Sequence, residues 1–415
     1  MPVPPRDLPS LDPTSQPETL DRERAVSAAR ALRPRLLAEA AATEARHYPS
    51  EELHAELAQA GLYNLMRPGT FGGYELPAAD YMAVVRELAR GDMSTAWCFT
   101  LSSGHVLWLA SWWPEQAQRE IFAEPFAMAN GTSAPTGRMR RVEDGWIVSG
   151  RFPYGSGGAY ATHFLGHGVE PRDDGSPAVH TFVLPRAQWS LEDDWGRLLG
   201  LRGSSSHTVV VEEQFVPDRF VLQNRTIVDI DVDGGTPGYR LHRSPIYNGR
   251  GIAFFSIELA NLAVGGALAM LDEYEDMLRS KKTALPPQVL RGEHPTYQLW
   301  YADAATTLTD AVAGLDHAAA LFLEYSTRAA KNEGSYSVVD DAHVGRLAFA
   351  AQQKAWRTVE GILMRTAGSS ALATGSRTDR IWRDLCMVHS HQNSIVQDIT
   401  APLYASGRLT ASSAQ

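Results

Sequence analysis

Two histidines near the C-terminal end of the chain, His389 and His391 in the run VHSHQN, are the first candidates for chemistry. An imidazole titrates near neutral pH, so a histidine at a reactive site can move protons there, although a histidine at a helix end is often only a surface residue. A two-residue spacing could suit a metal, but no carboxylate pair lies nearby in the sequence, and a metal site is not predicted. A third histidine, His105, lies in the apolar run LSSGHVLW, where histidine is more often a satisfied core residue.

A glycine-rich run surrounds Ser156 in PYGSGGAY, residues 153–160. Glycine lacks a Cβ and lets the backbone approach a flat ligand closely. The run GSGGAY nevertheless lacks the last glycine of the GxGxxG dinucleotide motif and lies among predicted strands. The phosphate-binding GxxxxGK[ST], zinc-binding HExxH and nucleophile GxSxG motifs do not occur in the sequence. A Rossmann nicotinamide site is therefore not predicted.

The composition excludes several function classes. The chain has 415 residues, 38 Lys and Arg against 48 Asp and Glu, and a net charge of −10. An acidic chain without a basic run argues against nucleic acid or an anionic membrane as partner. Its two cysteines, Cys98 and Cys386, form neither a zinc cluster nor a disulfide framework and favour a reducing cytoplasm.

Three zones of different periodicity follow a proline-rich start, and residues 1–19 are predicted to be a disordered leader. Residues 20–125 have helical spacing and predict helices at 24–45, 50–60, 80–91 and 93–113. Residues 126–240 alternate with period two and predict an antiparallel β domain with strands at 146–152, 162–169, 178–185 and 207–217. Residues 241–415 predict a bundle with long helices at 251–282, 296–332 and 339–368. The fold class is thus α+β, mostly α.

One apolar stretch, residues 252–271 (IAFFSIELANLAVGGALAML), is long enough to imitate a membrane span. Ser256, Glu258 and Asn261 interrupt it. We therefore expect a helix in the core of the bundle and no membrane segment.

Four segments, in order, are similar to the acyl-CoA dehydrogenase family. Residues 61–97 (GLYNLMRPGTFGGYELPAADYMAVVRELARGDMSTAW) resemble its N-terminal signature, and 144–158 (DGWIVSGRFPYGSGG) its middle-domain flavin segment. Residues 200–220 (GLRGSSSHTVVVEEQFVPDRF) resemble a strand pair of that domain, and 380–393 (RIWRDLCMVHSHQN) its C-terminal element. The resemblance implies an N-terminal helical domain, a middle β domain and a C-terminal four-helix bundle, assembled as a homotetramer.

Two departures from the family favour one branch. The glutamate that commonly abstracts a substrate proton in the dehydrogenases falls, counting from Arg383, at Gln392, whose amide cannot take a proton at neutral pH. The element that helps hold the ADP part of FAD appears as SKKTAL, residues 280–285, without its Phe and Gly. In both respects the sequence resembles the oxygenase components of two-component flavin-dependent monooxygenases, and the second departure favours FMN over FAD.

The resemblance assigns roles to residues that composition and spacing alone leave open. His391, His105 and Ser156 match catalytic positions, with the Ser156 hydroxyl close to flavin N5; the alternative for Ser156 is a plain turn serine. The cofactor-binding residues implied are Trp97, Asn130, Thr132, Ser133, Phe152, Tyr154, Ser156 and Gly157. Phe152 and Tyr154 could instead simply fill the core. Arg279 and Lys281 are candidate phosphate partners, with a solvated helix end as the alternative.

The function implied is an oxygenase component that takes reduced flavin, FMNH2 in preference to FADH2, from a separate NAD(P)H:flavin reductase. With O2, through a C4a-hydroperoxyflavin, it would hydroxylate an aromatic or polyketide-like small molecule. The alternatives are a flavin N-oxygenase acting on an amine or amino sugar, an acyl-CoA dehydrogenase-like flavin dehydrogenase, and a silent scaffold. An oxygenase should bind oxidised flavin weakly and consume NADH only with a reductase, whereas a dehydrogenase should be yellow and bleach with an acyl-CoA.

Overall fold

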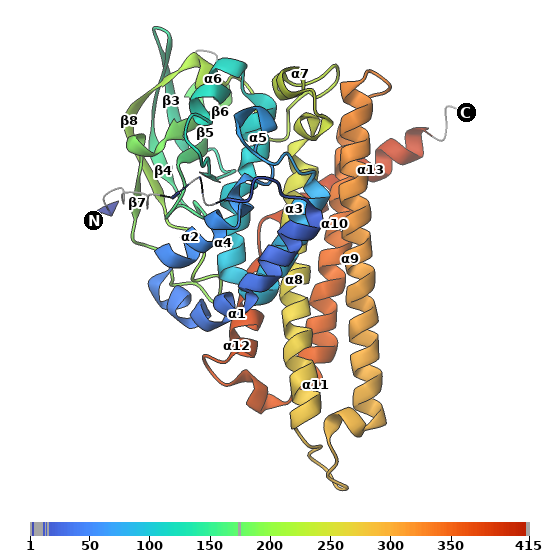
Figure 1. Ribbon diagram of the computed structural model, residues 1–415. Helices are drawn as coiled ribbons and strands as arrows, with labels where there is room; N and C mark the ends of the chain where they lie inside the picture. Colours follow the sequence, from blue (N-terminus) through green and yellow to red (C-terminus); the bar gives the residue numbers. More distant parts are fainter. Residues whose placement is uncertain (1, 4–10, 13, 15, 173–175, 412–415) are drawn as a thin grey trace.

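The computed structural model describes residues 2–3, 11–12, 14, 16–172 and 176–411 and places them in three parts (Figure 1). A group of shorter helices comes first, a curled sheet second, and a set of long helices third, along the side of the molecule away from the sheet. This order confirms the predicted α+β, mostly α fold.

Six helices make up the N-terminal part: α1 (Arg22–Arg46), α2 (Glu51–Gln59), α3 (Ala78–Gly91), α4 (Met93–Ser103), α5 (His105–Trp112) and α6 (Glu115–Ile121). The side chains of Asp21, Ser50 and Asp92 accept backbone N–H groups at the starts of α1, α2 and α4. The single helix predicted at 93–113 is interrupted at Gly104, where a Cβ would lie 1.8 Å from Oε1 of Glu258 in the central helix of the bundle. Glycine is needed there because that helix packs so closely.

The strands form a sheet in the order β1-β7-β8-β4-β3-β5-β6-β9, with β2 paired to β5. Their bounds are β1 (Pro2–Val3), β2 (Ala129–Gly131), β3 (Gly137–Val142), β4 (Gly145–Phe152), β5 (His163–Pro171), β6 (Pro177–Pro185), β7 (Ser190–Glu192), β8 (Val209–Pro217) and β9 (Val221–Leu222). The prediction of an antiparallel domain needs a correction, because β5 pairs in parallel with both β2 and β3. The sheet is therefore mixed, and these parallel pairings place the start of β5 beside β2.

Three long helices dominate the C-terminal part. They are α8 (Gly251–Ser280), α9 (Pro295–Ala330) and α10 (Val338–Thr358), which continues as a π-helical segment, Val359–Met364, and α11 (Arg365–Ala367). The shorter helices are α7 (Pro237–His242), α12 (Arg377–His389) and α13 (Asn393–Ala411). Helix α8 packs against α3, α9, α10 and α12, so it lies between the N-terminal helices and the rest of the bundle. By length and composition α8 could cross a membrane, but 83% of its most apolar window is buried inside the protein, as expected of a core helix.

Single-turn helices occur at Leu62–Asn64, Gly69–Phe71, Arg186–Gln188, Asp218–Phe220, Pro245–Asn248, Arg291–Glu293 and Ser369–Leu372. The predicted disordered leader, 1–19, falls partly outside the described residues, at 1, 4–10, 13 and 15. Among its described residues, Pro2 and Val3 pair with β7, and the carbonyl of Pro17 accepts a hydrogen bond from Tyr74, 2.6 Å away.

Candidate active site

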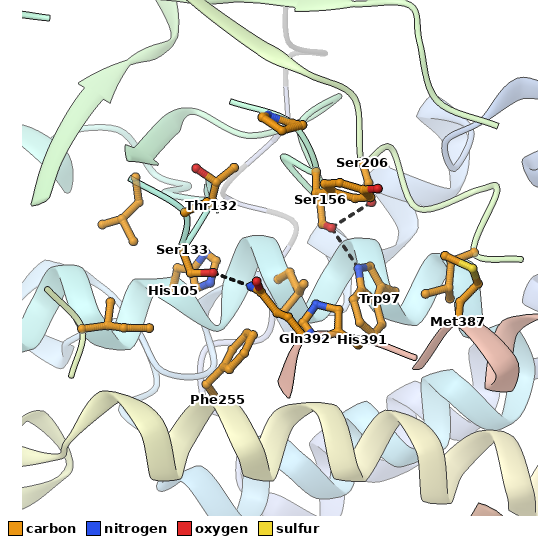
Figure 2. Close-up of a pocket in the computed structure, with 18 of the residues that line it drawn as sticks. Trp97, His105, Thr132, Ser133, Ser156, Ser206, Phe255, Met387, His391 and Gln392 are labelled. Carbon is orange, nitrogen blue, oxygen red and sulfur yellow. Dashed lines mark hydrogen bonds between the residues drawn. The ribbon is translucent and has the colours of Figure 1, made fainter. Parts of the chain in front are cut away.

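A cavity of about 440 Å³ lies where the three parts of the molecule meet. Its walls come from α4 and α5, from the sheet around β2 and β5, from the loop before β8, from α8, and from the junction between α12 and α13 (Figure 2). Cavities of roughly 300–1,000 Å³ lined mainly by apolar and aromatic groups, with few polar atoms, are typical ligand sites. Among the described residues that line this one, none is an Asp, Glu, Lys, Arg or Cys.

The first wall is a helical stripe: Trp97 and Leu101 on α4, and His105 and Trp108 on α5. Residues three or four apart on a helix share a face, so this spacing points all four side chains to the cavity. The break at Gly104 makes His105 the first residue of α5. The sequence predicted a helix over this run, although not the break, and the family resemblance placed Trp97 and His105 at the site.

His105 is buried and carries its proton on Nδ1, because Nδ1 lies 2.8 Å from the carbonyl oxygen of Ala129, which can only accept. Its ring stacks on that of Trp108 with centroids 4.8 Å apart. Burial lowers the pKa of His105 to about 4, so the ring is neutral at pH 7. A neutral ring protonated at Nδ1 leaves Nε2 as a hydrogen-bond acceptor.

His391 also lines the cavity and lies in the short turn between α12 and α13 (Figure 2). The backbone N–H of Asn393 donates to its Nδ1 at 3.2 Å, so the neutral ring carries its proton on Nε2 and offers a donor. Trp97 packs edge-on against the ring, with centroids 5.5 Å apart, and Phe255 of α8 flanks it at 5.9 Å. Burial lowers the pKa of His391 to about 4.

His389, the other half of the histidine pair, does not line the cavity. Its ring stacks on Trp356 of α10 with centroids 4.1 Å apart. The two histidines thus meet different neighbours and do not converge. Within the described part of the chain, no group of three or more His, Cys, Asp and Glu side chains is placed to hold a metal ion.

Ser156 lies on the sheet side of the cavity, in the turn after β4. Its Oγ accepts a hydrogen bond from Nε1 of Trp97, 2.9 Å away, and lies 2.8 Å from Oγ of Ser206 (Figure 2). The turn requires Gly157, whose φ is +77° and whose Cβ would lie 2.8 Å from the carbonyl oxygen of Cys98. The glycine brings the turn against α4, and so brings Ser156 to Trp97.

Thr132 and Ser133, which directly follow β2, complete the sheet side of the cavity. The Ser133 hydroxyl accepts a hydrogen bond from the Nε2 of Gln392, so the residue at the expected glutamate position does face the cavity. His167 of β5 also lines it and donates from Nδ1 to the Thr132 carbonyl at 2.8 Å, although nothing near this histidine in the sequence indicates a role. Tyr154 lines the mouth and is 61% exposed, with Trp195 edge-on beside it.

Three predicted cofactor-binding residues do not line the cavity. Phe152 is fully buried between Phe164 and Phe182 in the core of the sheet, so its predicted packing on the cofactor needs correction. The buried side chain of Asn130 donates to the carbonyl of Gly155 instead, at 3.4 Å, and supports the turn from behind. Gly157 acts through its backbone conformation. Arg279 and Lys281, the candidate phosphate partners, also lie outside the lining, and Arg279 pairs with Glu275 on its own helix.

The helix–sheet–bundle order and the cavity between the three parts define a protein of the acyl-CoA dehydrogenase type. Residues 20–130 match the family model described as acyl-CoA dehydrogenase, N-terminal domain, and residues 257–394 match that described as acyl-CoA dehydrogenase, C-terminal domain. The chain belongs to this family, and the resemblance inferred from the sequence is confirmed.

Within the family, the relatives are oxygenase components of flavin-dependent monooxygenases. The FADH2-dependent resorcinol hydroxylase, oxygenase component, of Rhizobium sp. (strain MTP-10005) is 29% identical over 354 residues, which cover 84% of this chain and 85% of the relative. The HsaA monooxygenase from M. tuberculosis has the same fold, with a TM-score of 0.82 at 22% identity over 94% of this chain and 98% of its own. XiaF from Streptomyces sp., solved in complex with FADH2 and glycerol, has a TM-score of 0.80 at 21% identity over 94% of this chain and 96% of its own.

The polar and apolar groups of the cavity wall match those that a flavin would need. Oγ1 of Thr132 and Nε2 of His167 are buried and have no hydrogen-bond partner among the described residues. Buried polar atoms are rarely left unsatisfied, so a ligand with donors and acceptors along one edge is expected there. The rest of the wall presents indole, phenyl and aliphatic groups suited to a flat ring.

Proposed function

We propose that this protein is the oxygenase component of a two-component flavin-dependent monooxygenase that hydroxylates an aromatic or polyketide-like small molecule. One observation carries the proposal: the described lining of the cavity includes no carboxylate, whereas His391 and His105 present a neutral donor and a neutral acceptor. A flavin dehydrogenase acting on a thioester needs a strong base for the substrate proton. Neutral imidazoles with pKa values of about 4 are poor bases of that kind.

The residues present can hold a flavin between the Trp97–Ser156 pair and the Thr132–Ser133 turn. When bound in reduced form, a flavin supplies the electrons with which O2 is activated. The described lining of the cavity is uncharged, and Trp108, Phe255 and Met387 give it apolar surface, which would favour the exclusion of water from the reacting groups when the cavity is filled. His391 lines the cavity with its Nε2–H available to donate to a bound group, and the hydrogen bond from the Asn393 amide to Nδ1 fixes this tautomer.

The substrate class follows from the opposite wall. Nε2 of His105 is an acceptor next to the flat face of Trp108, so this end of the cavity suits an uncharged aromatic ring that carries a hydroxyl group. A hydroxyl donating to Nε2 would be oriented and made more electron-rich, which favours attack on the ring beside it. A carboxylate or phosphate on the reacting ring would meet no cation in the described lining.

We further propose that FMNH2 is preferred over FADH2 and that it comes from a separate NAD(P)H:flavin reductase. The FMN preference rests on residues 280–285, which lack the aromatic and glycine that would help hold an ADP group. Equilibrium binding of FMNH2 and FADH2 under anaerobic conditions tests it, and tighter binding of FADH2 would contradict it. The cytoplasm, where such reductases and NAD(P)H occur, is the proposed location.

A homotetramer is proposed as the assembly. Helix α13 projects from the body of the molecule and exposes Ile395, Ile399 and Leu403, which are 64%, 69% and 40% exposed and recur every four residues. An apolar stripe of this kind on a helix is a typical surface for association with another copy. Light scattering coupled to size-exclusion chromatography should give a mass near four chains, and the Ile399→Lys variant should lower it.

The decisive experiment supplies the purified protein with FMN, NADH and a separate flavin reductase, and screens resorcinol and other phenols under ¹⁸O2. We expect a hydroxylated product that contains one ¹⁸O atom and forms only when both proteins are present. A flavin that stays bound and is bleached anaerobically by an acyl-CoA thioester would overturn the proposal in favour of a dehydrogenase.

A further inference from the structure

A row of buried hydroxyl groups begins at Ser156 on the sheet side of the cavity, which Ser206 and Leu201 of the same row also line (Figure 2). Nε1 of Trp97 lies 2.9 Å from Oγ of Ser156, which lies 2.8 Å from Oγ of Ser206. Oγ of Ser206 lies 2.7 Å from Oγ of Ser204, which lies 2.7 Å from the carbonyl oxygen of Leu201. The three serines are 5%, 3% and 0% exposed, so bulk water does not compete for these contacts.

The proton positions along this row follow from its two ends. The indole N–H of Trp97 can only donate and the carbonyl of Leu201 can only accept. Three serine hydroxyls must supply one proton to each of the three remaining contacts. Ser204 therefore donates to Leu201, Ser206 to Ser204, and Ser156 to Ser206. Reversing any of them would set two oxygen lone pairs against each other at hydrogen-bond distance.

The far end of the row is held firmly. The carbonyl of Leu201 also accepts a hydrogen bond from Nε1 of Trp195, 2.9 Å away, and the N–H of Leu201 donates to Oδ1 of Asp384 in α12 at 2.6 Å. Leu201 has a φ of +51°, an unusual conformation for leucine that these contacts maintain. Because the acceptor cannot turn away, the direction of the row is fixed.

We propose that Ser206 and Ser204 are positioning residues that make Ser156 an obligatory hydrogen-bond acceptor and so make the cavity selective for reduced over oxidised flavin. Reduced flavin carries a hydrogen on N5 and donates there, whereas oxidised flavin has a lone pair on N5 and accepts. A Ser156 hydroxyl whose proton points to Ser206 satisfies the first and repels the second. This inference rests on the proposed function, because it needs a flavin in the cavity with N5 near the Ser156 hydroxyl, the position that the family resemblance implies.

The test is the Ser206→Ala variant, measured by flavin binding and not by turnover. Loss of the Ser206 oxygen frees the Ser156 proton to turn toward the cavity and donate to N5 of oxidised flavin. We expect oxidised FMN to bind about tenfold more tightly and reduced FMN about tenfold more weakly, the usual size of one hydrogen bond gained or lost. Fluorescence titration gives the first affinity, and anaerobic titration gives the second. A variant that merely loosens the site would weaken both.

Matched variants isolate the role of the row. Ser205→Ala removes the neighbouring buried hydroxyl, which accepts from the N–H of Ala159 and takes no part in the row, so it should leave the ratio of the two affinities unchanged. Ser206→Thr keeps the hydroxyl and should keep the wild-type ratio. Ser204→Ala should shift the ratio in the same direction as Ser206→Ala but by less, because Ser206 can still accept from Ser156.

The outcomes separate the two proposals. If the wild-type protein takes up neither form of flavin, the proposed function fails. The function stands if the wild-type protein binds reduced flavin more tightly than oxidised flavin. The positioning role is nevertheless refuted if Ser206→Ala and Ser204→Ala change both affinities in the same direction, as a general loss of packing would. Thermal unfolding curves identify any variant that has lost its fold, and Ser204→Ala then decides the question alone.

Discussion

The two imidazoles of His105 and His391, which both line the cavity, differ in what they can do, although both are neutral at pH 7. His105 gives its Nδ1 proton to the carbonyl of Ala129 and presents an acceptor, whereas His391 receives the N–H of Asn393 on Nδ1 and presents a donor. Burial lowers the pKa of both to about 4. Both residues are histidines, and in each a single backbone group decides whether the ring presents a hydrogen-bond donor or an acceptor to the cavity.

The two walls also share the way in which they expose a histidine. His105 follows the interruption at Gly104, and His391 lies in the turn between α12 and α13. At His391 the start of α13 leaves the backbone N–H of Asn393 free to donate to the ring, whereas the partner of His105 is the Ala129 carbonyl of strand β2. The difference between the walls can therefore be tested by removing each ring in turn.

The largest effect is expected from His391→Ala. It removes the donor at the cavity centre, and we expect kcat for hydroxylation to fall by about 10²–10³-fold, as for loss of a group that transfers or holds a proton in the transition state. Binding of reduced flavin should change by less than about threefold. Rapid-quench product analysis with chemically reduced flavin measures the first, and anaerobic titration the second.

The control for this variant is His389→Ala, two residues away and outside the cavity, where the ring stacks on Trp356. Its turnover should stay within about twofold of the wild type, since only packing on α10 is lost. Equal losses from the two histidines would contradict the assignment of His391.

A smaller and different effect is expected from His105→Phe. The ring keeps its volume and its stacking on Trp108, but the acceptor at Nε2 is lost. We expect the KM for a phenolic substrate to rise by about 10–50-fold, the cost of one hydrogen bond to a substrate hydroxyl left unmade, with kcat less affected. Steady-state kinetics with saturating reductase measure both. A fall in kcat with KM unchanged would place His105 in proton transfer instead.

The sequence predicted those features of the cavity walls that depend on a pattern within one short segment. The sequence predicted a helix over the run that carries Trp97, Leu101, His105 and Trp108, because helical spacing is a local signal. The glycines around Ser156 predicted a backbone able to approach a flat ligand closely, which stays a prediction; in the structure Gly157 brings the turn against α4. Periodicity likewise gave the order of helices, sheet and bundle.

What the sequence could not give were contacts between distant segments. Ser156 and Ser206 are 50 positions apart and meet only because β4 pairs with β8. The Nδ1 partner of His105 comes from β2, so its tautomer could not be predicted from the run LSSGHVLW. Phe152 was misplaced because, although it is close to Ser156 in sequence, its ring turns into the sheet core.

A third prediction concerns the dependence of activity on pH and applies to both His105 and His391. An unperturbed histidine would give an activity change near its usual pKa of 6.5, but both rings have pKa values of about 4. We therefore expect kcat/KM with chemically reduced flavin to stay within about twofold from pH 5.5 to pH 8. An inflection between pH 6 and pH 7 that disappears in His391→Ala would contradict the buried, neutral state.

The lowered pKa values of His105 and His391 should also make the stability of the folded protein depend on pH. Between pH 4 and pH 6.5 the unfolded chain binds protons on these histidines that the folded protein does not. Their contribution to the free energy of unfolding is therefore full above pH 6.5 and is lost as the pH falls toward 4. Urea unfolding of the wild type and of His105→Phe over this range should show a shallower pH dependence in the variant.

The smallest effect on turnover is expected from Asp384→Asn, which probes a buried group that burial also keeps neutral, but by shifting its pKa in the opposite direction. Asp384 lies on α12, accepts the N–H of Leu201 at 2.6 Å and faces Oγ of Ser94 at 3.4 Å, so it connects the bundle to the loop before β8. Burial raises its pKa to about 8, with the nearby Asp92 adding to the shift. An asparagine resembles the protonated acid, so turnover at pH 7 should stay within about twofold of the wild type.

The stability of this variant provides the sharper comparison with the histidines. Between pH 4 and pH 8 the folded protein holds a proton on Asp384 that the unfolded chain has released, so this group makes the free energy of unfolding fall as pH rises through that range. The slope is opposite in sign to that of the two histidines. Asp384→Asn cannot ionise, so its stability relative to the wild type should increase steadily from pH 5 to pH 8 in urea titrations. A difference that stays constant with pH would mean that Asp384 is ionised in the folded protein and that its contact with Leu201 is an ordinary carboxylate hydrogen bond.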